Sequence, residues 1–300
     1  MKQVAIVSGK GGTGKTTVVA SLAYLAGSAV TVDCDVDAAN LALLLPGVDG
    51  PPQDFFAGER AEVDPELCSG CGVCASVCRF DAVDLDPASG LSRVDPLACE
   101  GCRACRLVCP TEAVGMRENL AGVWMLREGP TGPLVHARLG IAQGNSGKLV
   151  ARVREVARDE ATARGIGLVL IDGPPGIGCP VHAAITGADL VLAVAEPTPS
   201  GEHDLGRVLE LCRTFKLPAA VLVNKADLSV QHSRRIEAQA RAAGARVLGR
   251  LPFSPEVPRL LARGEPPFPL VPVAEGMNRL WLQLHALLLE PANLASQGGT

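Results

Sequence analysis

The chain has 300 residues and a mass of 31.0 kDa, which allows one large domain or a domain that carries an insertion. Hydrophobic residues make up 47% and charged residues 20%, the values of an ordinary globular protein, and they exclude a disordered or collagen-like chain. The 28 basic and 32 acidic residues leave a net charge of −4, which argues against nucleic-acid binding through bulk positive charge.

The sequence carries no signature of export or of membrane insertion. Its N-terminal residues lack the apolar core and cleavage site of a signal peptide, and no run of about 18 apolar residues occurs. We therefore expect a cytoplasmic protein without a membrane span. Eleven cysteines are present, and eight of them lie between Cys68 and Cys109. In a reducing compartment such a group indicates metal binding rather than disulfides.

Apolar strands separated by helix-length segments follow one another along most of the chain. The first strand, at 3–8, is followed by a glycine-rich loop and by a segment with helical spacing at 16–26. Further expected elements are strands at 29–35, 168–172, 190–196 and 219–224, and a helix at 146–164. This alternation predicts an α/β fold with a mostly parallel sheet and helices on both faces.

The pattern breaks between the second and third of these strands. Residues 59–118 are rich in cysteine and have almost no helical period. They also contain a repeat, because CSGCGVCASVCRFDAV from Cys68 returns as CEGCRACRLVCPTEAV from Cys99, 31 residues later. We expect an inserted domain at 59–118, with the two parts of the α/β domain at 1–58 and 119–300.

Two segments after the insert complete the prediction. Residues 119–140 have the composition of short strands with Gly-Pro turns. The last helical pattern, at 276–290, gathers apolar side chains on one face, namely Met277, Leu280, Trp281, Leu284, Leu287 and Leu288. A helix lying on a membrane would need cationic residues to meet the lipid headgroups, and few are present, so we expect a helix that packs on the core.

The octet GKGGTGKT at 9–16 has the spacing of a phosphate-binding loop and lies between a strand and a helix. Glycines let consecutive backbone N–H groups turn toward phosphates, and the helix N-terminus adds positive potential. Lys15 would neutralise the β- and γ-phosphates, and the Thr16 hydroxyl would bind Mg²⁺. The expected ATP contacts in and next to the loop are Gly9, Lys10, Gly11, Gly12, Thr13, Gly14, Lys15, Thr16 and Thr17.

The additional lysine, Lys10, gives the loop the form K-G-G-x-G-K-T, in a chain that has only six lysines beside 22 arginines. With this deviant Walker A loop the chain resembles the P-loop ATPases of the MinD, Mrp and nitrogenase iron-protein class. In that class the added lysine reaches the nucleotide of the partner subunit. The resemblance implies an ATP-sandwich dimer, either a homodimer or a heterodimer with a related ATPase, in which Lys10 and Lys15 are catalytic.

Two further motifs follow strands and resemble the switch regions of these ATPases. DCDVDAAN, from Asp33, is similar to switch I, and strand alternation places Asp33 and Asp35 on one face. The resemblance implies that Asp35 orients the attacking water and that Asp33 lies close to the magnesium ion. DGPPG, from Asp172, resembles switch II, in which the aspartate holds Mg²⁺ through water. Carboxylates at strand ends also serve as helix caps, and the sequence leaves that alternative open.

The segment NKAD at 224–227 is superficially similar to the guanine-reading motif of GTPases. In the MinD-like class, however, the asparagine at this strand end reads adenine. The resemblance therefore implies ATP as the nucleotide, with Asn224 and Pro252 beside the base. The segment 251–253 would form the other wall of the adenine site.

Each cysteine repeat has the spacing C-x2-C-x2-C-x3-C, which wraps three thiolates around one iron-sulfur cluster and sends the fourth to its neighbour. The spacing predicts one [4Fe-4S] cluster on Cys68, Cys71, Cys74 and Cys109, and a second on Cys78, Cys99, Cys102 and Cys105. A third cysteine after two residues disfavours zinc, whose sites use paired C-x2-C units farther apart. The insert resembles an α+β bacterial two-cluster ferredoxin, except that Cys78 is followed by Arg79 instead of proline. That guanidinium would raise the potential of the cluster or serve as a docking contact.

The remaining cysteines have different expected roles. Cys212 has the spacing of a helical core position and is expected to be inert. Cys179 follows switch II, where the nitrogenase iron protein has one of its two ligands to an intersubunit cluster. No clear second cysteine accompanies Cys179, so we expect a buried or partner-facing thiol rather than a bridging cluster.

The leading hypothesis is an Mg-ATP-hydrolysing dimer whose nucleotide state controls electron delivery from two clusters. The recipient would be a redox or metal-cofactor-bearing protein, as in the assembly of a metal cofactor. One alternative is a nucleotide-switched scaffold or carrier of clusters without electron transfer, and another is clusters that serve only to fold a small module. MinD-like action at a membrane is a third, against which the missing basic amphipathic tail counts. No nucleic-acid or membrane partner is expected.

Overall fold

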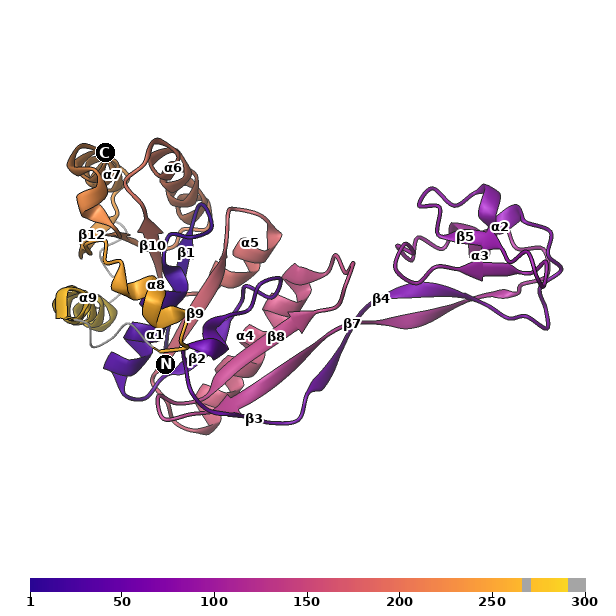
Figure 1. Cartoon of the computed structure of the whole chain (residues 1–300), viewed down its shortest axis with the longest axis horizontal. Coiled ribbons are helices and arrows are strands. Elements are labelled where there is room, and N and C mark those ends of the chain that lie inside the picture. The colour runs from indigo at the N-terminus through magenta and orange to yellow at the C-terminus, as the bar shows by residue number, and fades with distance from the viewer. Residues whose placement is uncertain (266–270, 291–300) are drawn as a thin grey trace. The chain divides into compact units, whose positions relative to one another are not determined.

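The computed structural model describes residues 1–265 and 271–290 of the chain (Figure 1). Two compact units are present. The first comprises Met1–Pro52, Trp124–Arg138 and Ser146–Thr300, and the second comprises Gln53–Val123 and Leu139–Asn145. The domain boundaries expected from the sequence, after residues 58 and 118, fall inside the second unit.

The first unit is built on a mostly parallel sheet. Its strands, in spatial order, are β12 (Arg246–Arg250), β11 (Ala219–Val223), β10 (Leu190–Ala195), β1 (Lys2–Ser8), β9 (Leu168–Pro175), β2 (Val30–Asp33), β8 (Leu134–Leu139), β7 (Val114–Glu128) and β3 (Val48–Asp49). Neighbours from β12 to β8 pair in parallel, and β3 pairs antiparallel with β7. The expected α/β fold with a mostly parallel sheet is confirmed.

The central strand, β1, is apolar on both faces. Its residues Val4, Ala5, Ile6 and Val7 are all completely buried. A strand of this kind belongs in the interior of a parallel sheet that helices cover on both sides. The carboxyl ends of β1, β2, β9, β10 and β11 meet at one edge of the sheet because the strands run in parallel, so the loops that follow them gather there.

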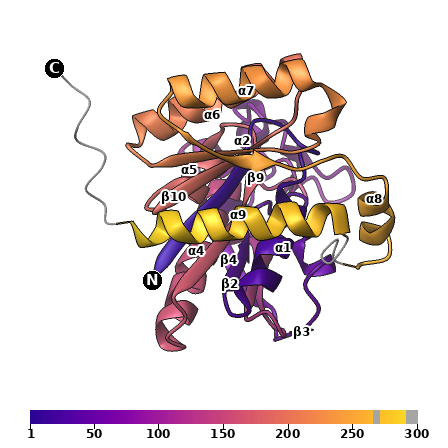
Figure 2. The same cartoon turned by 90° about the vertical axis from the view of Figure 1, so that its left-hand side faces the viewer.

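Helices lie on both sides of this sheet, with α9 on one side and α6 and α7 on the other (Figure 2). Leu22 of α1 (Lys15–Ala26) and Leu284 of α9 (Val271–Leu289) pack in one core with the strands. The helices are α1 (Lys15–Ala26), α4 (Ser146–Ala163), α5 (Cys179–Ile185), α6 (Pro199–Thr214), α7 (Val230–Ala242), α8 (Glu256–Leu261) and α9 (Val271–Leu289), with short 3-10 turns η1 (Leu41–Leu43) and η2 (Ala226–Leu228).

The apolar face expected on the last helix packs on the core. Met277, Leu280 and Leu284 of α9 are at most 1% exposed, and Trp281 and Leu287 pack partly buried against the same cluster. This confirms the interpretation of a core-packing helix. Within residues 1–265 and 271–290, no helix combines the length and the apolar composition that crossing a membrane requires.

The segment 119–140 contains the end of β7 and the whole of β8, joined by the Gly-Pro turn at 129–133, as expected, but β7 is longer than a short strand. β7 has 15 residues, begins in the second unit and ends in the first. Its pairing with β4 (Gln53–Val63) satisfies backbone groups over a length that local composition does not indicate. Most side chains of β4 are exposed or only partly buried, and β4 has no continuous apolar run, whereas the run in β7 covers only residues 120–126 of the strand.

The second unit repeats its backbone as well as its sequence. The short helices α2 (Val73–Ser76) and α3 (Ala104–Leu107) begin 31 residues apart. So do the left-handed residues before them, Gly72 and Arg103. The antiparallel hairpin of β5 (Val83–Leu85) and β6 (Ser92–Val94) lies between the two helices in the sequence. The internal repeat read from the cysteine spacing is therefore also a repeat of local structure.

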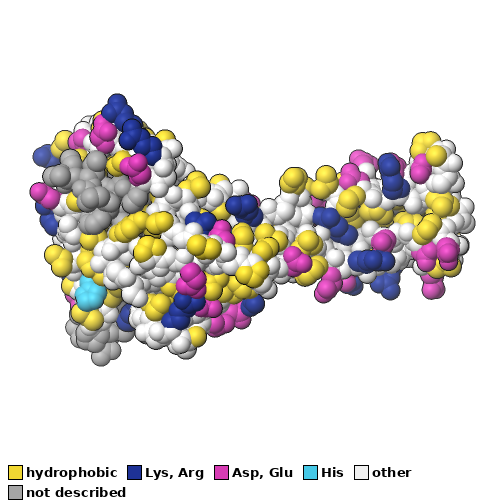
Figure 3. All heavy atoms as spheres, turned by 60° about the horizontal axis from the view of Figure 1, so that its bottom comes forward, with side chains coloured by type: hydrophobic (Ala, Val, Ile, Leu, Met, Phe, Trp, Pro, Cys, Tyr) yellow, Lys and Arg dark blue, Asp and Glu magenta, His cyan; other side chains and the backbone are white. Residues whose placement is uncertain are grey.

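The apolar core of the second unit is small. Within residues 53–123 the buried apolar side chains are Ala57, Ala61, Cys74, Ala82, Val83, Ala113, Val114 and Ala121. Larger ones face solvent, including Phe80 and Leu107, and Figure 3 shows apolar side chains mixed with both signs of charge on this unit, at the right. All eleven cysteines are free thiols. So little apolar burial gives a small unit little stability, which such domains obtain from metals or disulfides.

Candidate nucleotide site and cysteine-lined hollows

The phosphate loop between β1 and α1 ends at Gly14, which precedes α1 in the left-handed conformation, with φ +94°. A Cβ atom there would clash with Asn224 Nδ2, so the position requires glycine. Gly11 and Gly12 are exposed, whereas Lys15, the first residue of α1, is only 6% exposed. The loop therefore presents accessible backbone beside a buried cation.

Three carboxyl groups converge on Lys15. Asp33 ends β2 and lies in register with Asp172 of β9, and Asp35 follows on the next loop. Burial lowers the pKa of Lys15, whereas the charges of Asp172, Asp35 and Asp33 oppose this effect, in that order of size. The structure thus brings together the residues of the loop and of both switch motifs that were singled out in the sequence.

Asp33 holds the switch I loop through hydrogen bonds. Its carboxylate accepts from the backbone N–H of Asp35 at 3.1 Å and from those of Asn40 and Leu41 at 3.0 Å each. Both carboxylate oxygens are therefore occupied by backbone donors. Asp33 thus accepts hydrogen bonds from backbone N–H groups, as a capping carboxylate does, which is the alternative that the sequence left open. It does so at a position beside Asp172.

Asp172 is the carboxylate that fits a magnesium site. It is 1% exposed, and neither of its oxygens accepts a hydrogen bond of normal length. Burial raises its pKa well above the usual value, the charge of Asp33 raises the pKa further, and the nearby Thr16 hydroxyl opposes the rise. A buried, unpartnered oxygen donor beside a hydroxyl is an arrangement that a hard divalent cation completes. Thr16 and Asp172 are therefore suited to hold Mg²⁺.

We expect Asp33→Asn to flatten the pH dependence of stability of the nucleotide-free protein. Burial raises the pKa of Asp33 to about 6 in the folded chain, against 3.8 as the ordinary value, so the folded state holds this proton more tightly. The resulting stabilisation is fully present below about pH 4 and is lost as the pH rises through about 6, a change of up to about 3 kcal/mol.

Urea denaturation between about pH 4.5 and 7.5 measures this difference. The slope is the readout, because asparagine also loses loop hydrogen bonds, and that loss shifts the curve without changing its slope. Since burial raises the pKa of the neighbouring Asp172 and the charge of Asp33 raises it further, the substitution also changes the contribution of Asp172 to the slope. Equal slopes for wild type and variant would contradict a raised pKa at this position.

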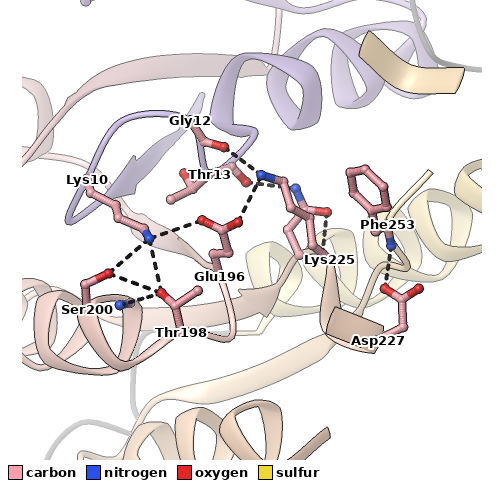
Figure 4. Close-up of polar contacts among 11 residues, drawn as sticks. Lys10, Gly12, Thr13, Glu196, Thr198, Ser200, Lys225, Asp227 and Phe253 are labelled. Carbon is pink, nitrogen blue, oxygen red and sulfur yellow. Dashed lines mark hydrogen bonds and ion pairs between the residues drawn. The ribbon is translucent and has the colours of Figure 1, made fainter. Parts of the chain in front are cut away.

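The segment that follows β11 contacts the phosphate loop directly (Figure 4). The Asn224 amide donates to the Thr13 carbonyl oxygen at 2.8 Å, and Lys225 Nζ donates to the Gly12 carbonyl oxygen at 3.0 Å. Two successive carbonyl groups of the loop are thus held by two successive side chains. The sequence suggested only base recognition for this asparagine, and the structure adds a contact that positions the loop.

The residues expected around the base also lie together. Asp227 accepts from the backbone N–H of Phe253 at 2.6 Å, and Ala226 donates its N–H to the Leu251 carbonyl oxygen at 2.8 Å. These bonds tie the segment 251–253, which contains the expected adenine contact Pro252, to the segment after β11.

Glu196 is a residue of this site that sequence reasoning missed. It follows β10 and pairs with Lys10 at 3.2 Å and with Lys225 at 3.1 Å. Lys10 also donates to Thr198 Oγ1 and to Ser200 Oγ, at 3.1 Å each. One signal could have found Glu196, because it directly follows a fully buried parallel strand at the edge of the sheet where the phosphate loop lies.

The eight clustered cysteines line two hollows in the second unit. One hollow is lined by Cys68, Cys71, Cys74 and Cys109. The other is lined by Cys78, Cys99, Cys102 and Cys105. Each hollow takes three cysteines from one repeat and the fourth from the other, which is the grouping that the spacing predicts.

Polar groups lie close to several of these sulfur atoms. The backbone N–H of Ala82 donates to Cys78 Sγ at 3.3 Å, and Cys74 Sγ lies 3.1 Å from Ser92 Oγ. Such contacts tune the sulfur ligands of iron-sulfur clusters. In the part of the chain that the structure describes, no three or more His, Cys, Asp or Glu side chains are arranged to hold a metal ion. Occupation of the hollows by clusters is therefore a proposal.

The three remaining cysteines differ in exposure. Cys179 begins α5 with an exposed side chain, so the buried alternative for this thiol is wrong. Cys212 is buried in α6, as its helical spacing predicts, and burial raises the pKa of its thiol to about 11. Cys34 is also buried. It is therefore not accessible as a second intersubunit ligand beside Cys179.

Comparison with known sequences identifies related proteins. A family model described as the CobQ/CobB/MinD/ParA nucleotide binding domain matches residues 4–268. The chain is 34% identical over 266 residues to the protein named Uncharacterized protein MJ0578 of Methanocaldococcus jannaschii, and the match covers 87% of each chain.

Solved structures of similar fold include two archaeal proteins. The cell division ATPase MinD of Pyrococcus furiosus superposes with a TM-score of 0.55 and 20% identity, covering 95% of this chain and 99% of that one. The septum site-determining protein MinD of Pyrococcus horikoshii, complexed with Mg-ADP, gives a TM-score of 0.56 and 19% identity, covering 99% of each chain. At these identities the likeness shows the fold.

Proposed function

Because this chain belongs to the CobQ/CobB/MinD/ParA nucleotide-binding family and is a P-loop ATPase of that family, we propose that its ATPase cycle controls electron transfer through two [4Fe-4S] clusters to a protein partner. The observation that carries the proposal is the pair of hollows, each lined by four cysteines drawn from both repeats. They occur in the same chain as a complete phosphate loop.

Hydrolysis would use residues that converge at the phosphate loop. Lys15 would neutralise the β- and γ-phosphates, and Lys10 of the partner subunit would add a second positive charge. Asp35 would orient the attacking water for in-line displacement. Thr16 and Asp172 would hold Mg²⁺, which supplies charge neutralisation when bound. The Mg-ADP complex of the Pyrococcus horikoshii protein supports this choice of nucleotide and metal.

Two further residues would support the same reaction. Asp33 would keep the switch I loop, and with it Asp35, in place beside the magnesium site, because it already binds three backbone N–H groups of that loop. Asn224 and Pro252 would flank adenine. The contact of Asn224 with the Thr13 carbonyl supports a second contribution, which is to couple the base site to the phosphate loop.

The second unit fits iron-sulfur clusters better than single metal ions. A cubane bonds its four thiolates to four different irons, and each hollow is lined by four cysteines, the number that one cubane needs. The unit buries no apolar side chain larger than valine within 53–123, so bound clusters would replace the missing core. Such clusters supply one-electron redox chemistry. We therefore propose a ferredoxin-like unit.

The partner would be a redox protein or one whose metal cofactor is being assembled. One observation favours the alternative of a cluster carrier without electron transfer. Cys71 and Cys102, the second cysteine of each repeat, are exposed, so a cluster held there would be accessible to an acceptor. We further propose a dimer, of identical or related chains, in the cytoplasm, where a reducing environment keeps the thiols free.

Protein purified without oxygen should contain about eight irons per chain. After reduction with dithionite, its electron paramagnetic resonance signals should change when Mg-ATP is added, because nucleotide state controls the cluster unit. The matched control is Lys15→Ala, which should retain the iron and lose the response to ATP.

Three results of this experiment are decisive. If the electron paramagnetic resonance signals and the oligomeric state of the iron-loaded wild type both stay the same when Mg-ATP is added, the proposed coupling between nucleotide and clusters is contradicted. Iron that passes to an apo-ferredoxin without any redox change would favour the carrier. Iron-free protein that still hydrolyses ATP normally would remove the clusters from the proposal.

A further inference from the structure

The carboxylate of Glu196 contacts two lysines that lie on either side of it (Figure 4). Its Oε2 is 3.2 Å from Lys10 Nζ, and its Oε1 is 3.1 Å from Lys225 Nζ. The Glu196 side chain is 16% exposed, and those of the two lysines are 29% and 26% exposed. Partial shielding from water makes these ion pairs stronger than pairs on an open surface.

Lys10 uses all of its donors within its own chain. An ammonium group carries three N–H donors, and those of Lys10 meet Glu196, Thr198 Oγ1 and Ser200 Oγ. Thr198 is itself fixed, because its hydroxyl caps α6 by accepting from the N–H of Gly201 at 3.0 Å. While it is held in this way, Lys10 has no donor left for a nucleotide on another subunit.

Lys225 is tied to the phosphate loop as well as to Glu196. Its ammonium also donates to the Gly12 carbonyl oxygen of the phosphate loop, and its backbone is left-handed, with φ +56°. A lysine keeps that conformation only where its surroundings impose it. Lys225 would therefore remain on Glu196 when Lys10 leaves. The carboxylate would keep one cation beside it, and the free-energy cost of an unpaired, shielded charge would be avoided.

Glu196 is ionised at neutral pH. Burial by itself would raise its pKa, but the hydrogen bonds and charges of Lys225 and Lys10 together outweigh burial and lower it. The Glu196 carboxylate thus pairs with two lysines. Lys225 is also bound to the phosphate loop, whereas Lys10 is bound by side chains alone.

We propose that Glu196 is a positioning residue that holds Lys10 on its own subunit until a phosphate group on the partner subunit competes for it. This inference rests on the proposed function, in which Lys10 acts across the dimer. Both competitors are anions, and a nucleoside triphosphate attracts the ammonium more strongly than a diphosphate does. Loss of the γ-phosphate would therefore return Lys10 to Glu196 and favour separation of the subunits.

Glu196→Gln tests the inference, because glutamine keeps the size of the side chain and an acceptor for Lys225 but removes the charge. The dissociation constant of the dimer, measured with Mg²⁺ and a non-hydrolysable ATP analogue, should fall about 5-fold, as expected for the loss of one competing ion pair. In nucleotide-free protein, Lys10 should be acylated several-fold faster, as read by peptide mass spectrometry. In a Lys10→Ala background the same substitution should leave dimerisation unchanged.

Glu202→Gln is the matched control. Glu202 lies in the first turn of α6, and its carboxylate contacts His232 at 2.5 Å, so this variant should dimerise and react like wild type. Weaker dimerisation of Glu196→Gln, or an equal effect with and without Lys10, would show that Glu196 only supports the fold. A wild-type protein that never dimerises would contradict the proposed function instead, and equal acylation of Lys10 in both proteins would overturn the inference in any case.

Discussion

Replacing Asp172 by asparagine is expected to lower Mg-ATP hydrolysis about 100- to 1,000-fold and to raise the melting temperature of the nucleotide-free protein. Activity falls because a neutral amide is a poorer partner for Mg²⁺ than a carboxylate. Stability rises because the carboxylate is buried, has no hydrogen-bond partner of normal length and lies beside Asp33. Each kcal/mol gained should add about 2 to 4 °C.

The gain in stability should grow with pH. Burial raises the pKa of Asp172, so ionisation of this carboxyl group lowers the free energy of unfolding more and more as the pH rises. Asparagine does not ionise and removes this destabilisation. Asp189→Asn is the matched control, since that carboxylate is 34% exposed and pairs with Lys2, and its loss should alter stability by only about 0.5 kcal/mol. An Asp172→Asn variant that is less stable, or that retains turnover, would contradict the assignment of a cation site here.

Pairs of cysteine substitutions should show that the two repeats share their ligands. Cys68→Ala with Cys109→Ala removes two ligands from one hollow, so one intact cluster and about four irons should remain. Cys68→Ala with Cys78→Ala removes one ligand from each hollow, so no intact [4Fe-4S] signal should remain. Iron analysis and electron paramagnetic resonance of the anaerobically purified variants measure both outcomes.

The reverse result would mean that each repeat holds its own cluster. In that case Cys68 and Cys78 would belong to the same site, and their joint loss would spare the other cluster. Cys212→Ala controls for the general effect of removing a thiol. Because Cys212 is buried in α6 of the first unit, that variant should keep its full iron content.

The parts of the fold that could be predicted from the sequence are those with a strong local signal. The central strands are continuous apolar runs, and the last helix has an apolar face with helical spacing. The local sequence of each element therefore predicts which of its side chains are buried. The grouping of cysteines around two hollows was also predictable, because the C-x2-C-x2-C-x3-C spacing directs three thiolates of a repeat to one site and the fourth to its neighbour.

The contacts around the phosphate loop were not predictable in this way. Lys10 and its acceptor Thr198 are 188 residues apart, and no periodicity records that β1 and β10 are neighbours. Asp33 shows a similar limit, because the motif indicates proximity to magnesium but not the three backbone donors that occupy its oxygens. β4 lacks a continuous apolar run and the run in β7 covers only residues 120–126, so the full length of these strands depends on their pairing with each other.

The position of β1 between β9 and β10 imposes an order on biosynthesis. The first strand to leave the ribosome acquires its neighbours only after residues 168–195 have been made. Both sets of four cysteines, in contrast, are complete at residue 109, and most of the second unit is complete at Val123. The cysteine-rich unit is therefore free to fold during translation, and under the proposed function to take up its clusters then, while the nascent nucleotide domain is still an unpaired chain.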